Sequence, residues 1–328
     1  MCEIYEDILL PGFWSFPSPD QVPEDLLLEF GDFAKKHGIE AAVPQIVTIS
    51  GLGVGTPITT ATLYVMQAFG APMARALLTG SSFVPTSHNN SELYTKIAHL
   101  LGDDVLYSSQ VVQAERSSDG VSVIVRSSDD KETLIQAKRL LITFAPTLDN
   151  MKPFNLDNSE TSTFSKWQYS NSYASIVSYP SLPVNGALVN TPVEAAPSNY
   201  LSTPDLPWLA RFTYIGPPGF RALIGVNRSL TSTEAKSVVE NNLETLIKAG
   251  TLPRSEGNTS LKWVAFSDHG AMHLRVGREE LRQGFIQELY GLQGMRGTWY
   301  TGATWSAQFT SVVWAYTETI LGKLVEGL

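Results

Sequence analysis

The C-terminal segment constrains the fold of this chain more than any other stretch. Residues 298–305, with the sequence TWYTGATW, predict a short strand followed by a turn at Gly302. Residues 306–328 predict a long terminal helix, on which Trp314 is expected to pack against the rest of the protein. An apolar stripe at helical spacing marks the core-facing side of that helix, and it consists of Phe309, Val312, Val313 and Tyr316.

Three aromatic residues lie outside this stripe and bracket the glycine turn. Trp299 and Tyr300 precede the turn, and Trp305 follows it. Large planar side chains in this arrangement can line an apolar pocket for a flat ring, and the alternative is that they pack in a core. We therefore predict a substrate pocket at Trp299, Tyr300 and Trp305.

A β-meander is predicted in the middle of the chain. Residues 105–107, 111–114, 121–125 and 134–135 are short, β-branched and nearly alternating. Asp119 and Gly120 supply a hairpin turn between two of these strands. The apolar run LLITFAP at residues 140–146 predicts a buried strand that ends at a proline turn.

The remaining segments predict a fold of the α/β (α+β) class. Residues 1–100 are mainly helical in pattern; one helix begins at Pro23 and ends at Gly38, and another runs from residue 91 to 101. Candidate strands follow at residues 174–179, 209–214 and 221–226, which suggest a mixed sheet. A capping box at residues 231–234 opens a helix that ends at Gly250.

Charge and composition exclude several classes of protein. The formal net charge is −9, whereas nucleic-acid binding needs a basic face, so no nucleic-acid partner is expected. No run of 18 apolar residues occurs, so we expect no membrane span. The N-terminal residues are acidic, unlike a signal peptide, and Cys2 is the single cysteine. We therefore expect a cytoplasmic location.

A glycine-rich run, Gly51-Leu52-Gly53-Val54-Gly55, follows the strand-like residues 45–49 and resembles a dinucleotide-binding fingerprint. The sixth position of that fingerprint is Thr56 rather than glycine, and Pro57 comes next. Ala71-Pro72-Met73 stands where an acidic residue would bind a ribose hydroxyl. The run therefore predicts a loop before a helix rather than a nucleotide site.

The histidines give no metal or catalytic motif. His269 and His273 have i, i+4 spacing, but Gly270 lies between them and no H-E-x-x-H pattern occurs. A G-x-S-x-G nucleophile motif is also absent from the sequence. We therefore predict no metal site and assign no catalytic residue.

Taken as a set, several of these segments resemble the flavin-containing amine-oxidase-like superfamily. Residues 91–146 resemble the middle of these enzymes: a helix, the run LGDDVLYSS, the meander and the apolar strand. Gln293-Gly294, residues 298–304 and the terminal helix with Glu318 resemble their C-terminal cofactor segment. The subgroup that the chain resembles is the fungal FAD-dependent oxidoreductases similar to β-cyclopiazonate dehydrogenase, to which several further residues fit: Asn155, Leu156, Asp157, Glu160, Phe164 and Trp167.

This resemblance implies a set of cofactor contacts. Val111 would touch the adenine of FAD through its backbone. Gly302, Ala303 and Thr304 would lie against the ribityl–pyrophosphate and the flavin, where glycine allows close approach and free N–H groups attract an anion. Many relatives have an acidic residue after the glycine, so Ala303 would make that contact through its backbone.

The resemblance also implies a domain organisation. Residues 1–100 would form the mainly helical part of a substrate domain, and residues 151–293 would form the rest of it. Residues 101–150 and 294–328 would be the remnant of an FAD-binding domain. The fold is thus expected to be an incomplete FAD-linked reductase or amine-oxidase-like fold, with a β-meander, a mixed-sheet substrate domain and a C-terminal cofactor-side helix.

The family begins with a strand, a G-x-G-x-x-G turn and a helix, and this sequence does not contain that unit. We therefore expect a truncated FAD-dependent oxidoreductase that binds little FAD alone, or one whose missing unit comes from a partner chain. Its reaction would be hydride removal from a small, largely apolar metabolite in fungal secondary metabolism. The alternative is a flavin-free pseudoenzyme, binding module or non-redox cyclase derived from such an enzyme.

Overall fold

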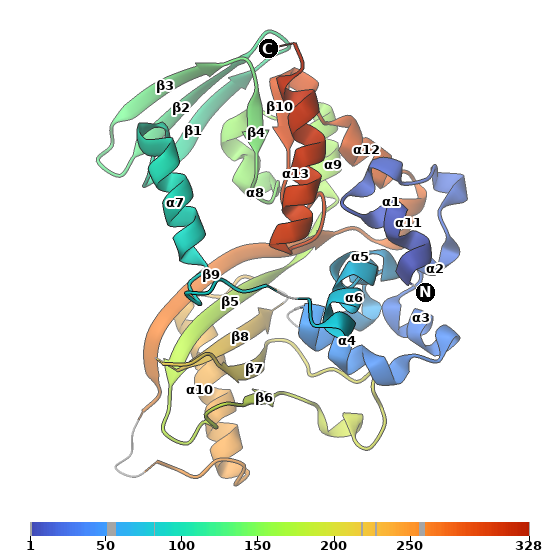
Figure 1. The fold of residues 1–328 in the computed structure, drawn as a ribbon, viewed down its shortest axis with the longest axis vertical. Coiled ribbons are helices and arrows are strands. Elements are labelled where there is room, and N and C mark those ends of the chain that lie inside the picture. The colour runs from blue at the N-terminus through green and yellow to red at the C-terminus, as the bar shows by residue number, and fades with distance from the viewer. Residues whose placement is uncertain are drawn as a thin grey trace. The chain divides into compact units, whose positions relative to one another are not determined.

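The computed structural model of the chain describes six stretches of residues: 2–50, 57–81, 83–217, 219–226, 228–255 and 260–327. The chain divides into two compact units, whose elements are labelled in Figure 1. Unit 1 consists of Met1–Ser18, Phe69–Lys166 and Gly284–Leu328, and unit 2 consists of Pro19–Ala68 and Trp167–Gln283. The predicted assignment of substrate-binding and FAD-binding parts stays a prediction.

The predicted β-meander is confirmed in unit 1 for three of its four predicted segments, whereas residues 105–107 lie before the first strand and form none. Strands β1 (Ser109–Arg116), β2 (Val121–Ser127) and β3 (Glu132–Ala137) form a three-stranded antiparallel sheet in that order. The turn before β2 closes with a hydrogen bond from the Ser117 N–H to the Gly120 carbonyl. A register shift between Val111 and Gln113 places a β-bulge in β1.

Two further strands of unit 1 form a separate parallel pair, β4 (Leu140–Ile142) and β10 (Thr298–Tyr300). The terminal helix α13 (Thr310–Val325) follows β10, but it begins after the predicted residue 306. The expectation that Trp314 is buried is wrong, because Trp314 is 48% exposed. Tyr316 and Ile320 supply the buried face of α13, and Trp314 lies on the other side of the helix.

Unit 1 contains further helices besides α13. The helix α7 ends at Gly102 as predicted, where the Gly102 N–H bonds to the Ala98 carbonyl. The α-helices are α1 (Glu6–Leu9), α6 (Ala71–Thr79), α7 (Ser91–Leu101), α8 (Leu148–Met151), α9 (Asn158–Ser165) and α12 (Phe285–Gly291). The 3-10 helices are Cys2–Tyr5, Phe13–Ser15, Gly102–Asp104, Lys152–Phe154 and Met295–Gly297.

Unit 2 contains a five-stranded sheet with the order β6-β7-β8-β5-β9. Its strands are β5 (Gln168–Ser178), β6 (Ala187–Val189), β7 (Trp208–Tyr214), β8 (Phe220–Val226) and β9 (Lys262–Arg275). Every neighbouring pair is antiparallel, so the expectation of a mixed sheet is wrong. Strands β8 and β9, which are connected through the helix that follows β8, do run in the same direction. However, β5 lies between these two strands and pairs antiparallel with both.

The longest strand, β9, is not among the predicted strands. Its register against β5 shifts at two places near Gly270 and His273, whose φ angles are +64° and +55°. These bulges interrupt the alternation of side chains by which a strand is recognised in a sequence. His269 and His273 therefore lie on a bulged strand, not on a helix.

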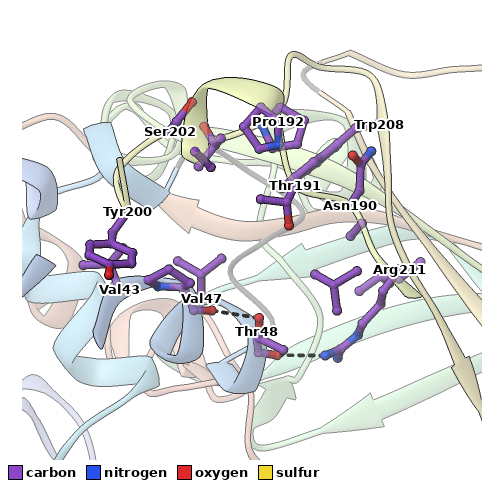
Figure 2. A pocket seen from close by; sticks show the side chains of 17 residues that line it. Val43, Val47, Thr48, Asn190, Thr191, Pro192, Tyr200, Ser202, Trp208 and Arg211 are labelled. Carbon is purple, nitrogen blue, oxygen red and sulfur yellow. Dashed lines mark hydrogen bonds between the residues drawn. The ribbon is translucent and has the colours of Figure 1, made fainter. Parts of the chain in front are cut away.

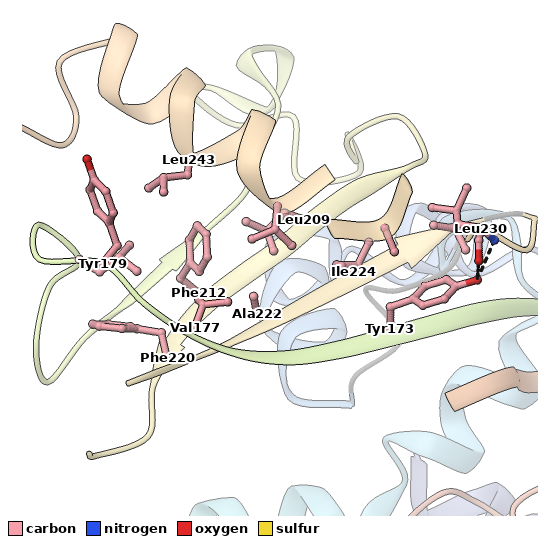
Figure 3. Close-up of a cluster of buried hydrophobic side chains, with 14 of the residues drawn as sticks. Tyr173, Val177, Tyr179, Leu209, Phe212, Phe220, Ala222, Ile224, Leu230 and Leu243 are labelled. Atoms are coloured by element: carbon pink, nitrogen blue, oxygen red, sulfur yellow. Dashed lines mark hydrogen bonds between the residues drawn. The ribbon is translucent and has the colours of Figure 1, made fainter. Parts of the chain in front are cut away.

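One face of this sheet is covered by α10 (Ser232–Lys248), as Figure 3 shows. The predicted capping box of this helix is confirmed, because the Thr231 side chain accepts from the Glu234 N–H and Glu234 caps the Thr231 N–H. The core under α10 joins side chains from the helix and strands: Leu209, Phe212, Ile224, Val226, Ala235, Val239 and Leu243. Its burial stabilises the unit through the hydrophobic effect.

Helices of unit 2 differ from the prediction in two places. The predicted helix from Pro23 to Gly38 is two helices, since Phe30 and Leu28 bond instead to Thr60 and Thr62 of a neighbouring segment. Residues 45–49, which look strand-like, belong to a helix. Pro44 in its first turn favours a helix start, and a short apolar run alone does not distinguish the two states.

The α-helices of unit 2 other than α10 are α2 (Glu24–Leu27), α3 (Phe30–His37), α4 (Val43–Ser50), α5 (Thr62–Ala68) and α11 (Arg278–Arg282). The 3-10 helices are Pro19–Gln21, Glu40–Ala42, Pro57–Thr59 and Val193–Ala195. The glycine-rich run Gly51–Gly55 lies outside the described residues.

Candidate functional site

The carboxyl ends of β4 and β10 meet at one edge of the parallel pair in unit 1. Leu140, Leu141 and Ile142 align with Thr298, Trp299 and Tyr300, and the Thr301 N–H continues the ladder by bonding to the Ile142 carbonyl at 2.9 Å. Ligands of open α/β sheets bind outside the carboxyl ends of parallel strands. This edge is therefore the candidate cofactor site.

Gly302 forms the turn immediately after β10. Its φ is +111°, a conformation that favours glycine, and a Cβ there would lie 2.8 Å from the Thr143 carbonyl oxygen. The turn closes through the Gly302 carbonyl, which accepts from the Trp305 N–H at 3.1 Å and from the Ser306 hydroxyl at 3.2 Å. Ala303 is exposed and Thr304 is half-buried, so the loop presents its outer side rather than packing into the core.

The three aromatic residues predicted to line a substrate pocket point to different places. Tyr300 and Trp305 are fully buried, and their rings stack with centroids 5.1 Å apart and an interplanar angle of 23°. Trp299 alternates with Tyr300 on the strand and lines, with Lys138, Arg296 and other residues, a depression of about 510 Å³. Their part in a substrate pocket stays a prediction.

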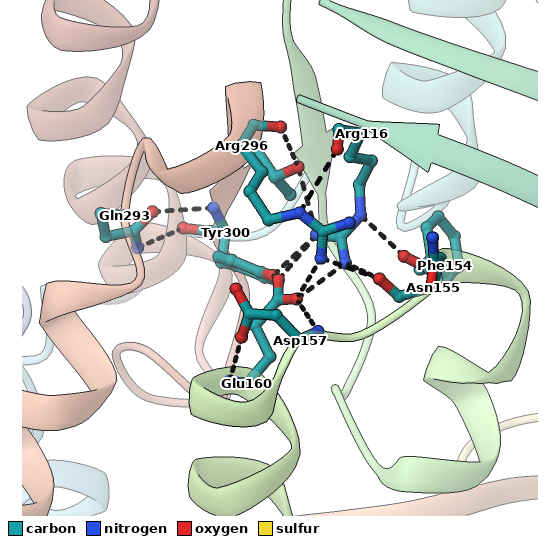
Figure 4. A network of polar contacts seen from close by, with 9 residues as sticks. Arg116, Phe154, Asn155, Asp157, Glu160, Gln293, Arg296 and Tyr300 are labelled. Carbon is teal, nitrogen blue, oxygen red and sulfur yellow. Dashed lines mark hydrogen bonds and ion pairs between the residues drawn. The ribbon is translucent and has the colours of Figure 1, made fainter. Parts of the chain in front are cut away.

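A buried ion pair lies beneath β10, as Figure 4 shows. The Arg116 guanidinium donates to both carboxylate oxygens of Glu160, from Nη1 to Oε1 at 2.7 Å and from Nη2 to Oε2 at 2.9 Å. Both side chains are at most 2% exposed. Arg116 Nε also donates to the Phe154 carbonyl at 2.8 Å, and Arg296 Nη1 donates to Glu160 Oε2 at 3.2 Å. The network thus joins β1, α9 and the segment before β10.

Tyr300 connects this ion pair to β10. Its hydroxyl donates to Glu160 Oε1 at 2.7 Å. Burial alone would raise the pKa of Glu160, but hydrogen bonds from Arg116 and Tyr300 outweigh it and hold that pKa below its ordinary value. Burial, together with the Glu160 charge, raises the pKa of Tyr300 well above its ordinary value, so its hydroxyl remains a donor.

Glu160 has a second role at the start of α9. Its carboxylate accepts from the Asp157 N–H at 3.1 Å, while the Asp157 carboxylate accepts from the Glu160 N–H at 2.8 Å. This reciprocal pair is a capping box. The resemblance singles out both residues, and the D-x-x-E spacing is the sequence signal for the cap. No sequence signal identifies Arg116 as the buried partner.

Gln293 holds the outer edge of β10. Its side-chain oxygen accepts from the Tyr300 N–H at 2.8 Å, and its Nε2 donates to the Tyr300 carbonyl at 2.9 Å. The same Nε2 lies 3.0 Å from the Tyr316 hydroxyl of α13. The Gly294 N–H also donates to the Thr298 carbonyl. The Gln293 amide therefore satisfies the backbone of Tyr300 as a neighbouring strand would.

Val111, the predicted adenine contact, lies on β1 next to the bulge and pairs with Val125 of β2. It is half-buried and belongs to unit 1, as does Gly302, which follows β10 of the other sheet of that unit. Val111, Gly302, Ala303 and Thr304 stay predicted cofactor contacts.

Unit 2 holds a partly open cavity of about 280 Å³ between α4 and the face of the sheet opposite α10. Figure 2 shows Val47 and Thr48 of α4 on one side and Thr191 and Pro192, which follow β6, on another. Strands β7 and β8 contribute Trp208, Ala210, Arg211 and Leu223. A cavity of this volume and lining can accept a small apolar molecule.

Other kinds of site are not found in the described part of the chain. No group of three or more His, Cys, Asp or Glu residues there can hold a metal ion. None of the helices searched, all among the described residues, combines the length and the apolar character that a membrane crossing requires.

Comparison with known proteins identifies the family, although no protein-family model matches the chain. A β-cyclopiazonate dehydrogenase of Aspergillus flavus is 35% identical over 306 residues, which are 93% of this chain and 64% of that protein. The FAD-dependent oxidoreductase pigF of Monascus ruber is 33% identical over 332 residues, which are 99% of this chain and 69% of that protein. The chain belongs to this family of fungal FAD-dependent oxidoreductases.

The family predicted from the sequence is thus confirmed. The chain spans about two thirds of the length of these oxidoreductases. Among solved structures, a fatty acid isomerase from P. acnes matches with a TM-score of 0.73 at 18% identity, over 99% of this chain and 72% of that one. A putrescine oxidase variant matches with a TM-score of 0.62 at 11% identity, over 98% of this chain and 72% of that one. The fold is therefore amine-oxidase-like, as the sequence predicts.

Proposed function

We propose that the protein is an FAD-dependent oxidoreductase that removes hydride from a small, largely apolar metabolite in fungal secondary metabolism. The proposal rests on one observation, which is that the chain belongs to a family whose members are named as dehydrogenases or FAD-dependent oxidoreductases. The parallel pair β4–β10, which ends in the Gly302 turn, supports it from the geometry. The alternative of a flavin-free binding module or non-redox cyclase has no observation in its favour.

The described residues fit one part of FAD. Gly302, Ala303 and Thr304 present a loop at the carboxyl ends of two parallel strands, where backbone N–H groups can meet a cofactor. We propose that they contact the flavin side of FAD and that the backbone of Val111 contacts its adenine. FAD, when bound, supplies the hydride acceptor. Tyr300, Trp305 and Gln293 would hold the loop in place from beneath.

A phosphate-binding turn is not found among the described residues, where no strand, glycine-rich turn and helix follow one another. We infer that another segment binds the pyrophosphate. It would correspond to the part of the relatives that has no counterpart in the matched residues, and it would lie in the same chain or in a partner chain. The exposed apolar face of α7 supports this inference. It consists of Leu93, Tyr94, Ile97, Leu100 and Leu101, and such a face is covered when a neighbouring segment packs on it.

The test compares the chain alone with a fusion to the segment of the Monascus ruber relative that the match leaves uncovered. We expect the fusion to purify with a visible flavin absorption band and the chain alone to carry little. The fusion should also bind less of a dye that fluoresces on exposed apolar surfaces. A fusion that folds but takes up no flavin would instead favour the flavin-free alternative.

A further inference from the structure

The cavity of unit 2 contains a guanidinium group among described lining residues that are otherwise uncharged. Arg211 is the one charged residue among the 17 described residues that line it; the others are apolar or neutral. A register shift between Leu209 and Arg211 places a bulge in β7. Because of this bulge, Ala210 and Arg211 both line the cavity, while Leu209 and Phe212 face the core under α10. The bulge thus directs Arg211 to this side of the sheet.

The hydrogen bonds of Arg211 leave part of its guanidinium unused. Its Nη1 donates to the Thr48 carbonyl at 3.0 Å, as the dashed line in Figure 2 shows. Its Nε is buried without a hydrogen-bond partner in the described part of the chain. No carboxylate of a described residue lies within 4 Å of it. A buried donor of this kind is costly unless a partner binds it.

The surroundings of Arg211 disfavour its positive charge. Burial lowers the pKa of Arg211, and the like charge of Arg221 on β8 lowers it further. The neighbouring Trp208, which also lines the cavity, has a buried indole N–H without a partner among the described residues. The cavity wall therefore offers donors, and none of the described lining residues is an acid that could compete for them.

We propose that this cavity binds a small apolar molecule through one planar oxyanion, a carboxylate or an ionised enol, held by Arg211. The guanidinium presents its N–H groups in a plane that matches such a group. The walls from α4 and from the segment after β6 would cover the apolar body, since Val43, Val47, Val189 and Pro192 lie there. The proposal concerns unit 2 alone and does not rest on the redox function.

The experiment uses the chain as it is and a matched pair of probes, naphthalene-2-acetate and its primary amide. Binding is measured by titration calorimetry. We expect the carboxylate to bind with a dissociation constant below about 1 mM and at least about tenfold more tightly than the amide. Arg211→Gln should bring the two dissociation constants together, whereas Arg211→Lys should keep a preference for the carboxylate.

Arg221→Gln is the control, because Arg221 is exposed and acts on Arg211 only through its charge. It should keep the preference for the carboxylate. Three results would overturn the proposal: equal binding of both probes to the native chain, no carboxylate binding up to about 1 mM, or an equal loss of preference in Arg221→Gln and Arg211→Gln. If Arg211→Gln does not fold, the native chain and Arg211→Lys still decide the outcome.

Discussion

The Tyr300 hydroxyl donates a 2.7 Å hydrogen bond to the carboxylate of Glu160, and so ties the last residue of β10 to the first turn of α9. Because Glu160 also binds Arg116, three segments far apart in the sequence depend on one carboxylate. The candidate cofactor site at the carboxyl ends of β4 and β10 should therefore lose stability when this network is changed.

Glu160→Gln should lower the free energy of unfolding by about 3–5 kcal/mol, because it leaves the buried Arg116 charge uncompensated. Urea denaturation measures the loss. The matched control is Glu132→Gln, whose ion pair with Arg126 is exposed on the meander and should contribute less than about 1 kcal/mol. The double variant Arg116→Met/Glu160→Leu should recover part of the loss, because it removes the uncompensated charge but also the acceptor of the Tyr300 hydroxyl. Equal losses at Glu160 and Glu132 would contradict this account.

The same carboxylate predicts a pH dependence of stability. The pKa of Glu160 is lower in the folded protein than its ordinary value of about 4.3. The folded state then binds the proton less tightly than the unfolded state, so its stabilisation is complete above that ordinary value and is lost as pH falls through the folded pKa. Unfolding midpoints between about pH 6 and about pH 3 should fall more steeply for the native protein than for Arg116→Met/Glu160→Leu. Parallel curves would show that Glu160 is not responsible.

Gly302→Ala should release FAD from the fusion protein and also lower its stability. The added Cβ would lie 2.8 Å from the Thr143 carbonyl oxygen, and the residue would keep a positive φ, a strain of about 1–3 kcal/mol. Gly297→Ala is the control at the other end of β10, with φ of +67° and a Cβ 3.1 Å from the Ser117 carbonyl oxygen. Both variants should melt earlier, but only Gly302→Ala should lose flavin absorbance. Equal flavin content in the two would remove the cofactor role of this turn.

Trp305→Ala and Trp314→Ala should differ in their effect on stability. Trp305 is fully buried against Tyr300, so truncating it should cost about 3–5 kcal/mol. Trp314 is 48% exposed on α13, and its truncation should cost less than about 1 kcal/mol. Thermal melts of the two variants give the comparison. A larger loss for Trp314 would mean that another segment covers it.

Local sequence signals predict much of the fold. The Asp119-Gly120 turn, the capping box at Thr231 and the helix end at Gly102 all appear where expected, because each depends on residues next to one another. Strand β9 is not predicted from the sequence. Its bulges lie near Gly270 and His273, and their positions depend on pairing with β5, which no local sequence signal reveals. Residues 45–49 form a helix because tertiary packing decides the state of a short apolar run.

The site is less predictable than the fold. The glycine turn at Gly302 is visible in the sequence, and Glu160 is identified by resemblance. The pairing of Glu160 with Arg116 joins two positions that no spacing rule connects. Arg211 is one basic residue within the apolar strand β7, and only the bulge beside it reveals the side of the sheet that it faces.

The Gln293 side chain has a consequence for the growth of the parallel sheet. Its amide occupies the backbone groups of Tyr300, and the Gly294 N–H occupies the Thr298 carbonyl, so the outer edge of β10 has no room for another strand there. β4 pairs with no second strand in the part of the chain that the structure describes. Unpaired strand edges are templates for strand addition. Gln293 thus makes the two outer edges of the pair different. A third strand, from whatever source, can be added beside β4 but not beside β10.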